Sequence, residues 1–168
     1  MQYTVQMLPA KVAGALPEFT AKLPDGEATF ASKDLIYGKD RSGKYLFGIA
    51  ERRADPATPL QRKYLFSVDD EGALHATGAD TAAGEQIVDG IAARAVLVAL
   101  AAYRNSSNKF PLASIGWRST DELVTVMFVP ARSDNEKAII GGATSLGTEI
   151  HYEISRSELK VIRTTFAR

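Results

Sequence analysis

The chain has 168 residues, within the usual size of one domain, and its 20 basic residues balance its 20 acidic residues. This balance excludes the strongly basic character of nucleic-acid-binding domains, so we expect no nucleic-acid partner. The absence of cysteine excludes disulfides, thiolate nucleophiles and zinc sites built on thiolates. With 45% apolar and 24% charged residues the composition is that of a folded protein, and we expect a single globular domain over residues 1–168.

No segment reaches the roughly 20 apolar residues that a membrane-spanning helix needs. The most apolar stretch, residues 91–103, is interrupted by Arg94, and we expect it to be a core helix. The first residues lack the basic and apolar regions of a signal peptide. We therefore expect no membrane span and a cytoplasmic protein. The alternative is a periplasmic protein whose signal peptide has been removed.

The first half of the chain contains several patterns that predict strands. Polar and apolar residues alternate over residues 3–7, as in a strand with one exposed face, and residues 11–16 predict a short helix. Two segments, 44–49 and 63–68, nearly repeat each other and are rich in aromatic and branched residues, so we expect neighbouring strands. In each segment we expect alternate side chains to share a face: Tyr45, Phe47 and Ile49 in the first, and Tyr64, Phe66 and Val68 in the second.

Turn and loop signals separate these strands. Pro56 and Pro59 lie among charged residues between the two segments and predict a loop over residues 51–61. Residues 69–72, with the sequence Asp-Asp-Glu-Gly, predict a tight turn. After this turn, residues 73–76 are expected to return as the second strand of a hairpin.

A long helix is expected over residues 81–104. Asp80 or Thr81 can cap its first turn, and Arg104 suits its negative end. Residues 95–103 carry no charge, and a helix that is apolar on all sides has to be covered on all sides. We therefore expect this helix to form the core of the protein.

The pattern after the helix is again that of strands. Residues 112–117 and 150–154 predict strands, residues 123–129 predict a central strand covered on both faces, and residues 159–166 complete a final hairpin. The connections are mostly short, which favours antiparallel neighbours. The predicted fold class is α+β. We expect an antiparallel β-sheet, with hairpins before and after the helix, wrapped around one long central helix at about residues 81–104.

A long helix followed by an antiparallel meander that ends in residues 152–154 and 159–163 resembles the cystatin-like and NTF2-like group of small α+β proteins. The resemblance covers residues 81–166 and lies in the order of the elements, without a diagnostic motif. It implies a sheet that curls around the main helix. Members of the group include inhibitors, immunity proteins, binding domains and some enzymes, so the resemblance implies no particular functional residue in this chain.

Residues 38–45 fit the phosphate-binding motif GxxxxGK as far as its lysine. The next residue is Tyr45 where the motif needs Ser or Thr, and aromatic strand sequence follows where the motif needs a helix. We therefore interpret this segment as a hairpin turn and expect no cofactor.

Glu149, His151 and Glu153 alternate with apolar residues along one predicted strand and are expected to share a face. A carboxylate beside an imidazole can orient the ring and raise its basicity, so His151 is a candidate general acid or base. The alternative is that the row is simply the solvent-exposed face of a hairpin. The other histidine, His75, is distant in the sequence and no metal-ligand spacing is present, so we expect no metal site.

Candidate binding residues lie in the glycine-rich part of a long interval, residues 130–147. Glycine lets a backbone approach a ligand closely, and long loops in compact domains are often functional. The residues singled out there are Gly141, Gly142, Thr144 and Ser145. Trp117, the only tryptophan, is a further candidate for an interface, with a place in the core as the alternative.

These features favour a protein that binds another protein without catalysing a reaction, such as an inhibitor or an immunity-type neutraliser. Its contact surface would be the exposed face of the sheet and the 130–147 loop. One alternative is a small enzyme or ligand-binding protein with a pocket in a curled sheet, where His151 is the acid or base and Glu149 or Glu153 orients it. Another alternative is a structural subunit of a homo-oligomer or a larger assembly.

Overall fold

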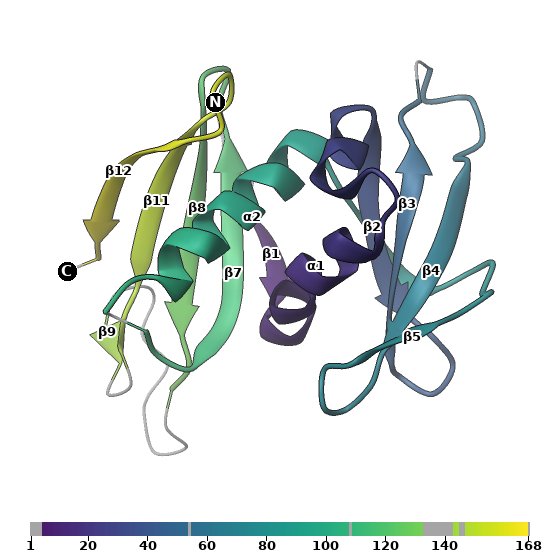
Figure 1. The fold of residues 1–168 in the computed structure, drawn as a ribbon, viewed down its shortest axis with the longest axis horizontal. Coiled ribbons are helices and arrows are strands. Elements are labelled where there is room, and N and C mark those ends of the chain that lie inside the picture. The colour runs from purple at the N-terminus through teal and green to yellow at the C-terminus, as the bar shows by residue number, and fades with distance from the viewer. Residues whose placement is uncertain (1–4, 54, 108, 133–142, 145–146, 168) are drawn as a thin grey trace. The chain divides into compact units, whose positions relative to one another are not determined.

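The computed structural model describes residues 5–53, 55–107, 109–132, 143–144 and 147–167 (Figure 1). The chain divides into two compact units. Unit 1 contains Met1–Ala13 and Ala95–Arg168, whereas unit 2 is the continuous segment Gly14–Arg94. Helices α1 (Ala10–Lys22) and α2 (Gly90–Arg104) each begin in one unit and end in the other.

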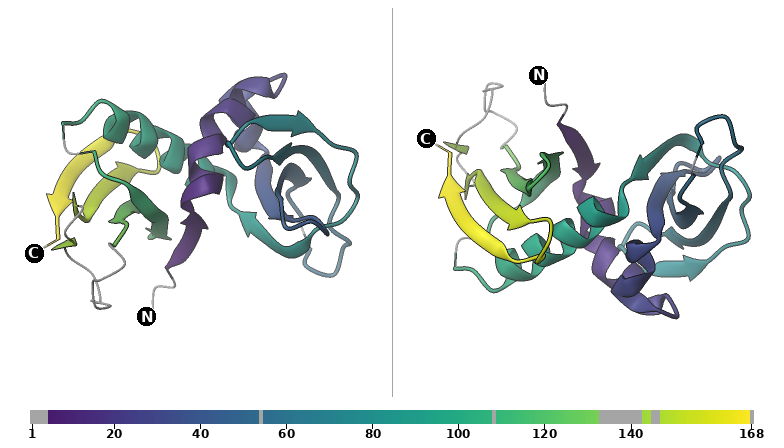
Figure 2. Two further views of the ribbon diagram at one scale, coloured as in Figure 1. Left: turned by 90° about the horizontal axis from the view of Figure 1, so that it is seen from below. Right: turned by 90° about the horizontal axis from the view of Figure 1, so that it is seen from above.

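Unit 2 contains a five-stranded antiparallel sheet in the order β5-β4-β3-β2-β6. Strands β2 to β5 form a meander, and β6 pairs with the free side of β2. The views in Figure 2 show that this sheet is strongly curved. The elements are η1, a short 3₁₀ helix (Gly26–Ala31), β2 (Lys33–Lys39), β3 (Tyr45–Glu51), β4 (Arg62–Val68), β5 (Leu74–Ala76) and β6 (Ala83–Val88).

Unit 1 contains a second five-stranded antiparallel sheet, in the order β1-β7-β8-β11-β12. Its strands are β1 (Gln6–Pro9), β7 (Leu112–Ser119), β8 (Leu123–Pro130), β11 (Ile150–Ser155) and β12 (Val161–Phe166). Strand β8 lies at the centre, as its continuous apolar sequence predicts. A separate two-residue ladder joins β9 (Ala143–Thr144) to β10 (Gly147–Thr148).

The two units share one order of elements. In each, a helix is followed by four strands that form an antiparallel meander: β2 to β5 after α1, and β7, β8, β11 and β12 after α2. Strand β1, which precedes α1, pairs with β7, whereas β6, which precedes α2, pairs with β2. The sequence therefore contains two βαββββ halves, and each half supplies the fifth strand of the other half's sheet.

One face of the unit 2 sheet packs on α1. The Phe19 ring stacks on Phe47 with 4.9 Å between ring centroids and meets Phe66 edge-on at 6.0 Å. The opposite face carries a second group of buried side chains, Ile36, Leu46, Ala50 and Tyr64, with Leu60, Ala79 and Ala82 packed against it. Side chains therefore pack on both faces of this sheet.

Tyr64 and Phe66 lie on opposite faces of this sheet, so the prediction that they share a face is wrong. Phe47 pairs with Phe66 and Gly48 pairs with Tyr64, which leaves Leu65 as an extra residue in the β3–β4 ladder. A β-bulge of this kind shifts the alternation of side chains by one residue. The bulge thus directs Tyr64 away from the α1 side of the sheet.

The Tyr64 side chain joins two strands that are not neighbours, β4 and β6. Its hydroxyl donates a hydrogen bond to Glu85 Oε2, and Arg62 Nε lies 3.1 Å from the same oxygen. Burial, and then the bond to Glu85, raise the pKa of Tyr64 well above its usual value of 10.0. The three side chains therefore tie β6 to β4 across the curved sheet.

Helix α2 begins at Gly90, so the predicted start at residue 81 is wrong. Ala83–Val88 form β6, because pairing with β2 overrides the helix-like spacing of the apolar residues there. Asp89, rather than Asp80 or Thr81, caps the helix: its Oδ1 accepts hydrogen bonds from N–H groups two and three residues ahead, at 2.9 and 3.3 Å.

The first turn of α2 is held closely by other parts of unit 2. The Gly90 N–H donates to Asp34 Oδ1 at 3.0 Å, and Arg52 donates to the same atom through Nη2 at 3.2 Å. A Cβ atom at residue 90 would lie 2.1 Å from the carbonyl oxygen of Phe30 and 2.6 Å from that of Lys33. Only glycine fits this close approach of backbone to backbone.

The core of unit 1 lies between α2 and one face of its sheet. The Tyr103 ring stacks on Phe128 at 4.6 Å, and Phe128 meets Tyr152 edge-on at 5.3 Å. The Tyr103 hydroxyl also donates to the Phe110 carbonyl oxygen at 2.6 Å and accepts from the Phe110 N–H at 2.7 Å. This pair of bonds fixes the loop that follows the helix.

The apolar segment 95–103 is buried on one face only. The buried residues recur at helical spacing: Ala95, Val96, Ala99, Leu100 and Tyr103. Leu97 and Val98 are half-buried and Ala101 is exposed, so the prediction of cover on all sides is wrong. The reason is that small or partly covered apolar residues are common on protein surfaces, and lack of charge does not require burial.

Two hairpin turns use the same hydrogen bonds. Asp40 Oδ1 accepts from N–H groups two and four residues ahead at 2.9 and 3.0 Å, and Asp69 Oδ1 does the same at 3.0 and 2.8 Å. Gly43 and Gly72 occupy the left-handed position of each turn, with φ of 86° and 85°. Both turns are confirmed, and the segment that resembles a phosphate loop is the β2–β3 hairpin.

The fold class is α+β with antiparallel sheets, as predicted, although there are two sheets. The nearly repeated segments 44–49 and 63–68 are the neighbouring strands β3 and β4, and residues 73–76 lie in the hairpin with β5. The three strand segments and the hairpin expected after the long helix also form. Among the described residues, no helix has both the length and the apolar character needed to cross a membrane.

Candidate protein-interaction surface

Among the described residues, four strands lie at the edges of the two five-stranded sheets: β5 and β6 in unit 2, and β1 and β12 in unit 1. An edge strand can pair with another chain, and most proteins protect their edges. β5 has three residues, β1 has four and ends at Pro9, and β6 carries a register shift and the tie through Glu85. β12 has six residues and no proline, and its register shift lies at its start, opposite Ile154. β12 is therefore the least protected edge.

The backbone of β12 alternates between bonding to β11 and pointing away from it. The Ala167 N–H donates to the Glu149 carbonyl oxygen at 3.0 Å, in register with the β11–β12 ladder. Antiparallel bonds recur at every second residue, so Arg163 and Thr165 also point toward β11. The N–H and C=O groups of Thr164 therefore point to the open side of the strand.

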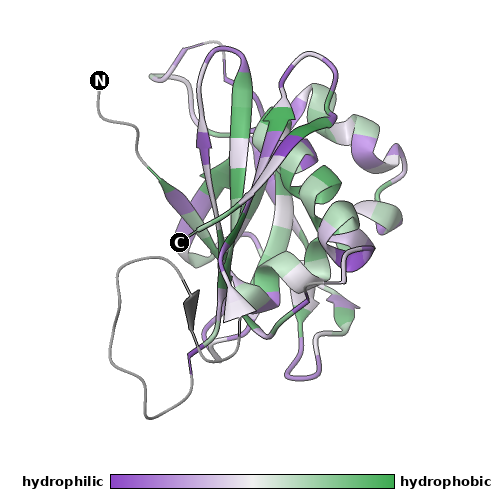
Figure 3. Ribbon diagram, turned by 90° about the vertical axis from the view of Figure 1, so that its left-hand side faces the viewer, coloured by the Kyte–Doolittle hydropathy of each residue, from purple (hydrophilic) through white to green (hydrophobic). Residues whose placement is uncertain are grey.

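The side chains of β12 are mostly exposed. Ile162 is 56% exposed and Phe166 is 51% exposed, whereas most large apolar side chains on β8 and β11 are buried. Figure 3 views this sheet from the β12 side and shows apolar and polar residues following one another along its strands. The Arg163 side chain is 69% exposed, and its Nε lies 4.0 Å from Glu153 Oε2 on β11. β12 thus combines an open backbone edge with exposed apolar and cationic side chains.

Glu149, His151 and Glu153 lie on the face of the sheet opposite to Tyr152, as their alternation predicts. His151 Nε2 lies 2.7 Å from Glu149 Oε1, and the two side chains are 26% and 13% exposed. A carboxylate at this distance can orient the imidazole, as a general acid or base requires. Two concavities formed by described residues, one in each unit, are lined by other side chains.

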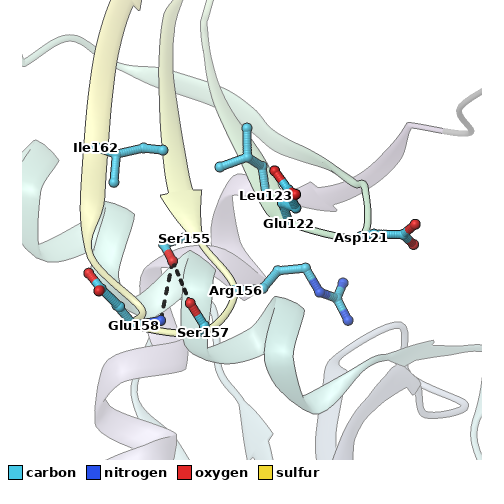
Figure 4. Close-up of a pocket in the computed structure, with 8 residues that line it drawn as sticks. All are labelled: Asp121, Glu122, Leu123, Ser155, Arg156, Ser157, Glu158 and Ile162. Carbon is cyan, nitrogen blue, oxygen red and sulfur yellow. Dashed lines mark hydrogen bonds between the residues drawn. The ribbon is translucent and has the colours of Figure 1, made fainter.

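A concavity of about 620 Å³ lies at the end of the sheet where β11 turns into β12 (Figure 4). Leu123 and Ile162 supply its apolar part. Ser155 Oγ lies 3.1 Å from Ser157 Oγ and accepts from the Glu158 N–H at 3.2 Å, which shapes the turn. The other lining residues are charged: Asp121, Glu122, Arg156 and Glu158. The concavity adjoins β12 through Ile162.

A second concavity, of about 220 Å³, lies in unit 2 beside Asp34, Arg52 and Ile87. Its polar groups are already engaged, because Asp34 binds both Arg52 and the first N–H of α2. Arg52 also donates to the carbonyl oxygens of Ala31 and Phe30 at 3.4 and 3.5 Å. These contacts position the start of α2.

The binding residues expected from the sequence do not gather at one place in the described structure. Gly141, Gly142 and Ser145 lie outside the described residues, as does most of the 130–147 loop. Thr144 belongs to β9 and pairs with Gly147. Trp117 is 4% exposed and, by alternation along β7, lies on the same face as Ile115 in the core, the alternative left open by the sequence.

Sequence analysis identified residues 159–166 as a strand but missed its exposed edge. The signal was the presence of Val161, Ile162 and Phe166 on a strand whose other residues, within Val161–Phe166, are polar or cationic. Within the described residues no group of three or more His, Cys, Asp or Glu side chains is arranged to hold a metal ion. Comparisons of the chain with protein-family models, with curated proteins and with solved structures found no match.

Proposed function

We propose that this protein binds another protein by taking an extended segment of the partner as an additional strand beside β12. The observation that carries the proposal is the open backbone edge of β12 together with its exposed apolar side chains, Ile162 and Phe166. In strand addition, main-chain hydrogen bonds supply affinity and alternate side chains supply specificity. β12 offers both.

The contrast with the other edges supports this assignment. β5 and β1 are shorter, and β6 is tied to β4 through Glu85. The concavity beside Ile162 adds room for a side chain of the partner at one end of the strand. Acid–base catalysis by His151 has one supporting contact, to Glu149, whereas binding at β12 is supported by the strand edge and by its exposed side chains.

The experiment uses a neutral strand-forming peptide, Thr-Val-Thr-Val-Thr-Val-Thr, at millimolar concentration and follows the backbone amides of the protein by NMR. We expect the amide signals of Thr164 and Phe166 to shift on titration, with increased protection of Thr164 from hydrogen exchange. The largest shifts should follow β12 and should not involve β5.

The decisive variant is Thr164→Pro, because proline removes an N–H that points away from β11 and is tolerated at such edge positions. The variant should stay folded, by circular dichroism, and should lose peptide binding. Thr164→Val keeps the N–H and is the matched control that should still bind. Binding by Thr164→Pro at the wild-type affinity, or no binding by the wild type, would exclude strand addition at β12.

A further inference from the structure

We propose that the partner segment taken up at β12 is acidic, with an Asp or Glu side chain opposite Arg163. This inference rests on the proposed function and specifies the chemistry of the partner. It is carried by the charge of the edge and by the direction in which Arg163 projects.

Arg163 is the one charged residue of β12, and Lys160 immediately precedes the strand. The Arg163 side chain is 69% exposed, and its ion-pair partner, Glu153, lies at the long distance of 4.0 Å and is itself 30% exposed. The positive charge of Arg163 is therefore only weakly compensated within the chain.

The strand geometry decides where a partner's acidic group would lie. Arg163 pairs with Glu153 across the β11–β12 ladder, so its side chain shares the face of Glu153 and His151. In an added strand, the residue opposite Arg163 has its Cβ about 4.5–5.5 Å away on the same face, within reach of an ion pair. The next residues of the added strand project to the other face, where Phe166 is exposed. The recognised segment therefore alternates acidic and apolar residues.

The same charges argue against a second copy of this chain as the occupant. Antiparallel pairing of β12 with another β12 would bring together two strands whose one charged side chain is Arg163, and like charges across a strand pair are unfavourable.

The experiment compares two peptides that differ only in charge, Thr-Val-Glu-Val-Glu-Val-Thr and Thr-Val-Lys-Val-Lys-Val-Thr, titrated against the full chain. The net charge of the protein is zero, so a preference reports local charges. We expect the Glu peptide to bind roughly two- to fivefold more tightly, the size expected for an opposite-charge pair across strands, with a larger ratio at low salt.

Two variants assign the preference to Arg163. Arg163→Gln should remove it, and Arg163→Glu should reverse it; the first keeps the test valid if the second does not fold. Equal affinities in the wild type, or a preference that Arg163→Gln leaves unchanged, would overturn the acidic assignment. If one of these outcomes occurred but Thr164→Pro still abolished binding of both peptides, strand addition at β12 would stand and only the acidic assignment would fail. A dimer that Thr164→Pro dissociates would overturn the choice of partner.

Discussion

The two units share one topology but differ in how their sheets are finished. In unit 2 buried side chains pack on both faces of the sheet, and the edge strand β6 is tied to β4 by Tyr64, Glu85 and Arg62. In unit 1 the helix covers one face, the other carries the partly exposed His151–Glu149 pair, and the edge strand β12 is open. Two sheets with the same order of strands therefore differ in the residues at their edges, because β6 is tied to its sheet and β12 is not.

The largest expected effects come from the two cores, if each core stabilises only its own unit. Phe128→Ala and Phe47→Ala each remove a fully buried ring and should each cost about 3–5 kcal/mol in the free energy of unfolding. The ring contacts of each residue lie within its own unit, so native-state hydrogen exchange should accelerate in β7 and β8 for the first variant and in β2 and β3 for the second. Equal acceleration in both sheets would mean that the units open together.

The contacts of Tyr64 and Arg62 with Glu85, which tie β6 to β4, can be weakened by removing one oxygen atom. Tyr64→Phe removes the hydroxyl that binds Glu85 and should lower the free energy of unfolding by about 1.5–3 kcal/mol, toward the lower end because Glu85 is partly exposed. Urea denaturation measures this value. Tyr45→Phe, at a half-buried position, is the matched control and should change stability by less than about 0.5 kcal/mol. Equal losses of unfolding free energy in the two variants would mean that the bond to Glu85 does not stabilise this sheet.

Two glycines sharpen the contrast between the helices. Gly90→Ala should destabilise the protein by about 1–3 kcal/mol, because the new Cβ would meet two backbone carbonyl oxygens. Gly14→Ala, inside α1, meets no atom within 4 Å and should stabilise by about 0.5–1 kcal/mol. Thermal unfolding of both variants gives the two signs. A stable Gly90→Ala protein would contradict the close approach at the start of α2.

The smallest effect is a pH dependence in the β4–β5 hairpin. The hydrogen bond from His75 holds the pKa of Asp69 below its usual value of 3.8. Ionised Asp69 therefore stabilises the folded state above the ordinary pKa of the carboxyl group, and this stabilisation is lost as the pH falls through the lowered pKa. Asp69→Asn should flatten the fall of Tm between about pH 4 and pH 2, with Asp121→Asn, outside this hairpin, as the control. An unchanged slope would contradict this role.

Local chemistry made much of the fold predictable. The turns at Asp40 and Asp69 were identified because Asp and Gly stand at the positions that such hairpins need. The alternation in Ile150–Ser155 predicted both the strand and the shared face of His151 and Glu149. These features depend on neighbours in the sequence.

The errors arose where distant residues decide the structure. The apolar spacing around Ala83–Val88 suits a helix or a strand, and pairing with β2 selects the strand. The bulge at Leu65 could not be read from a regular aromatic pattern. Val161–Phe166 was identified as a strand, but whether a strand has one neighbour or two depends on the whole sheet. The candidate surface was missed for that reason.

The exchange of first strands has a consequence for synthesis on the ribosome. Leu8 of β1 is made about a hundred residues before its partner in β7, Ile115. All of unit 2, Gly14–Arg94, is translated in between, so its sheet can form while β1 still waits for β7. Closing so long a loop is slow compared with local pairing. During translation, β1 therefore stays without its sheet partner until the whole of unit 2 and then β7 have been made.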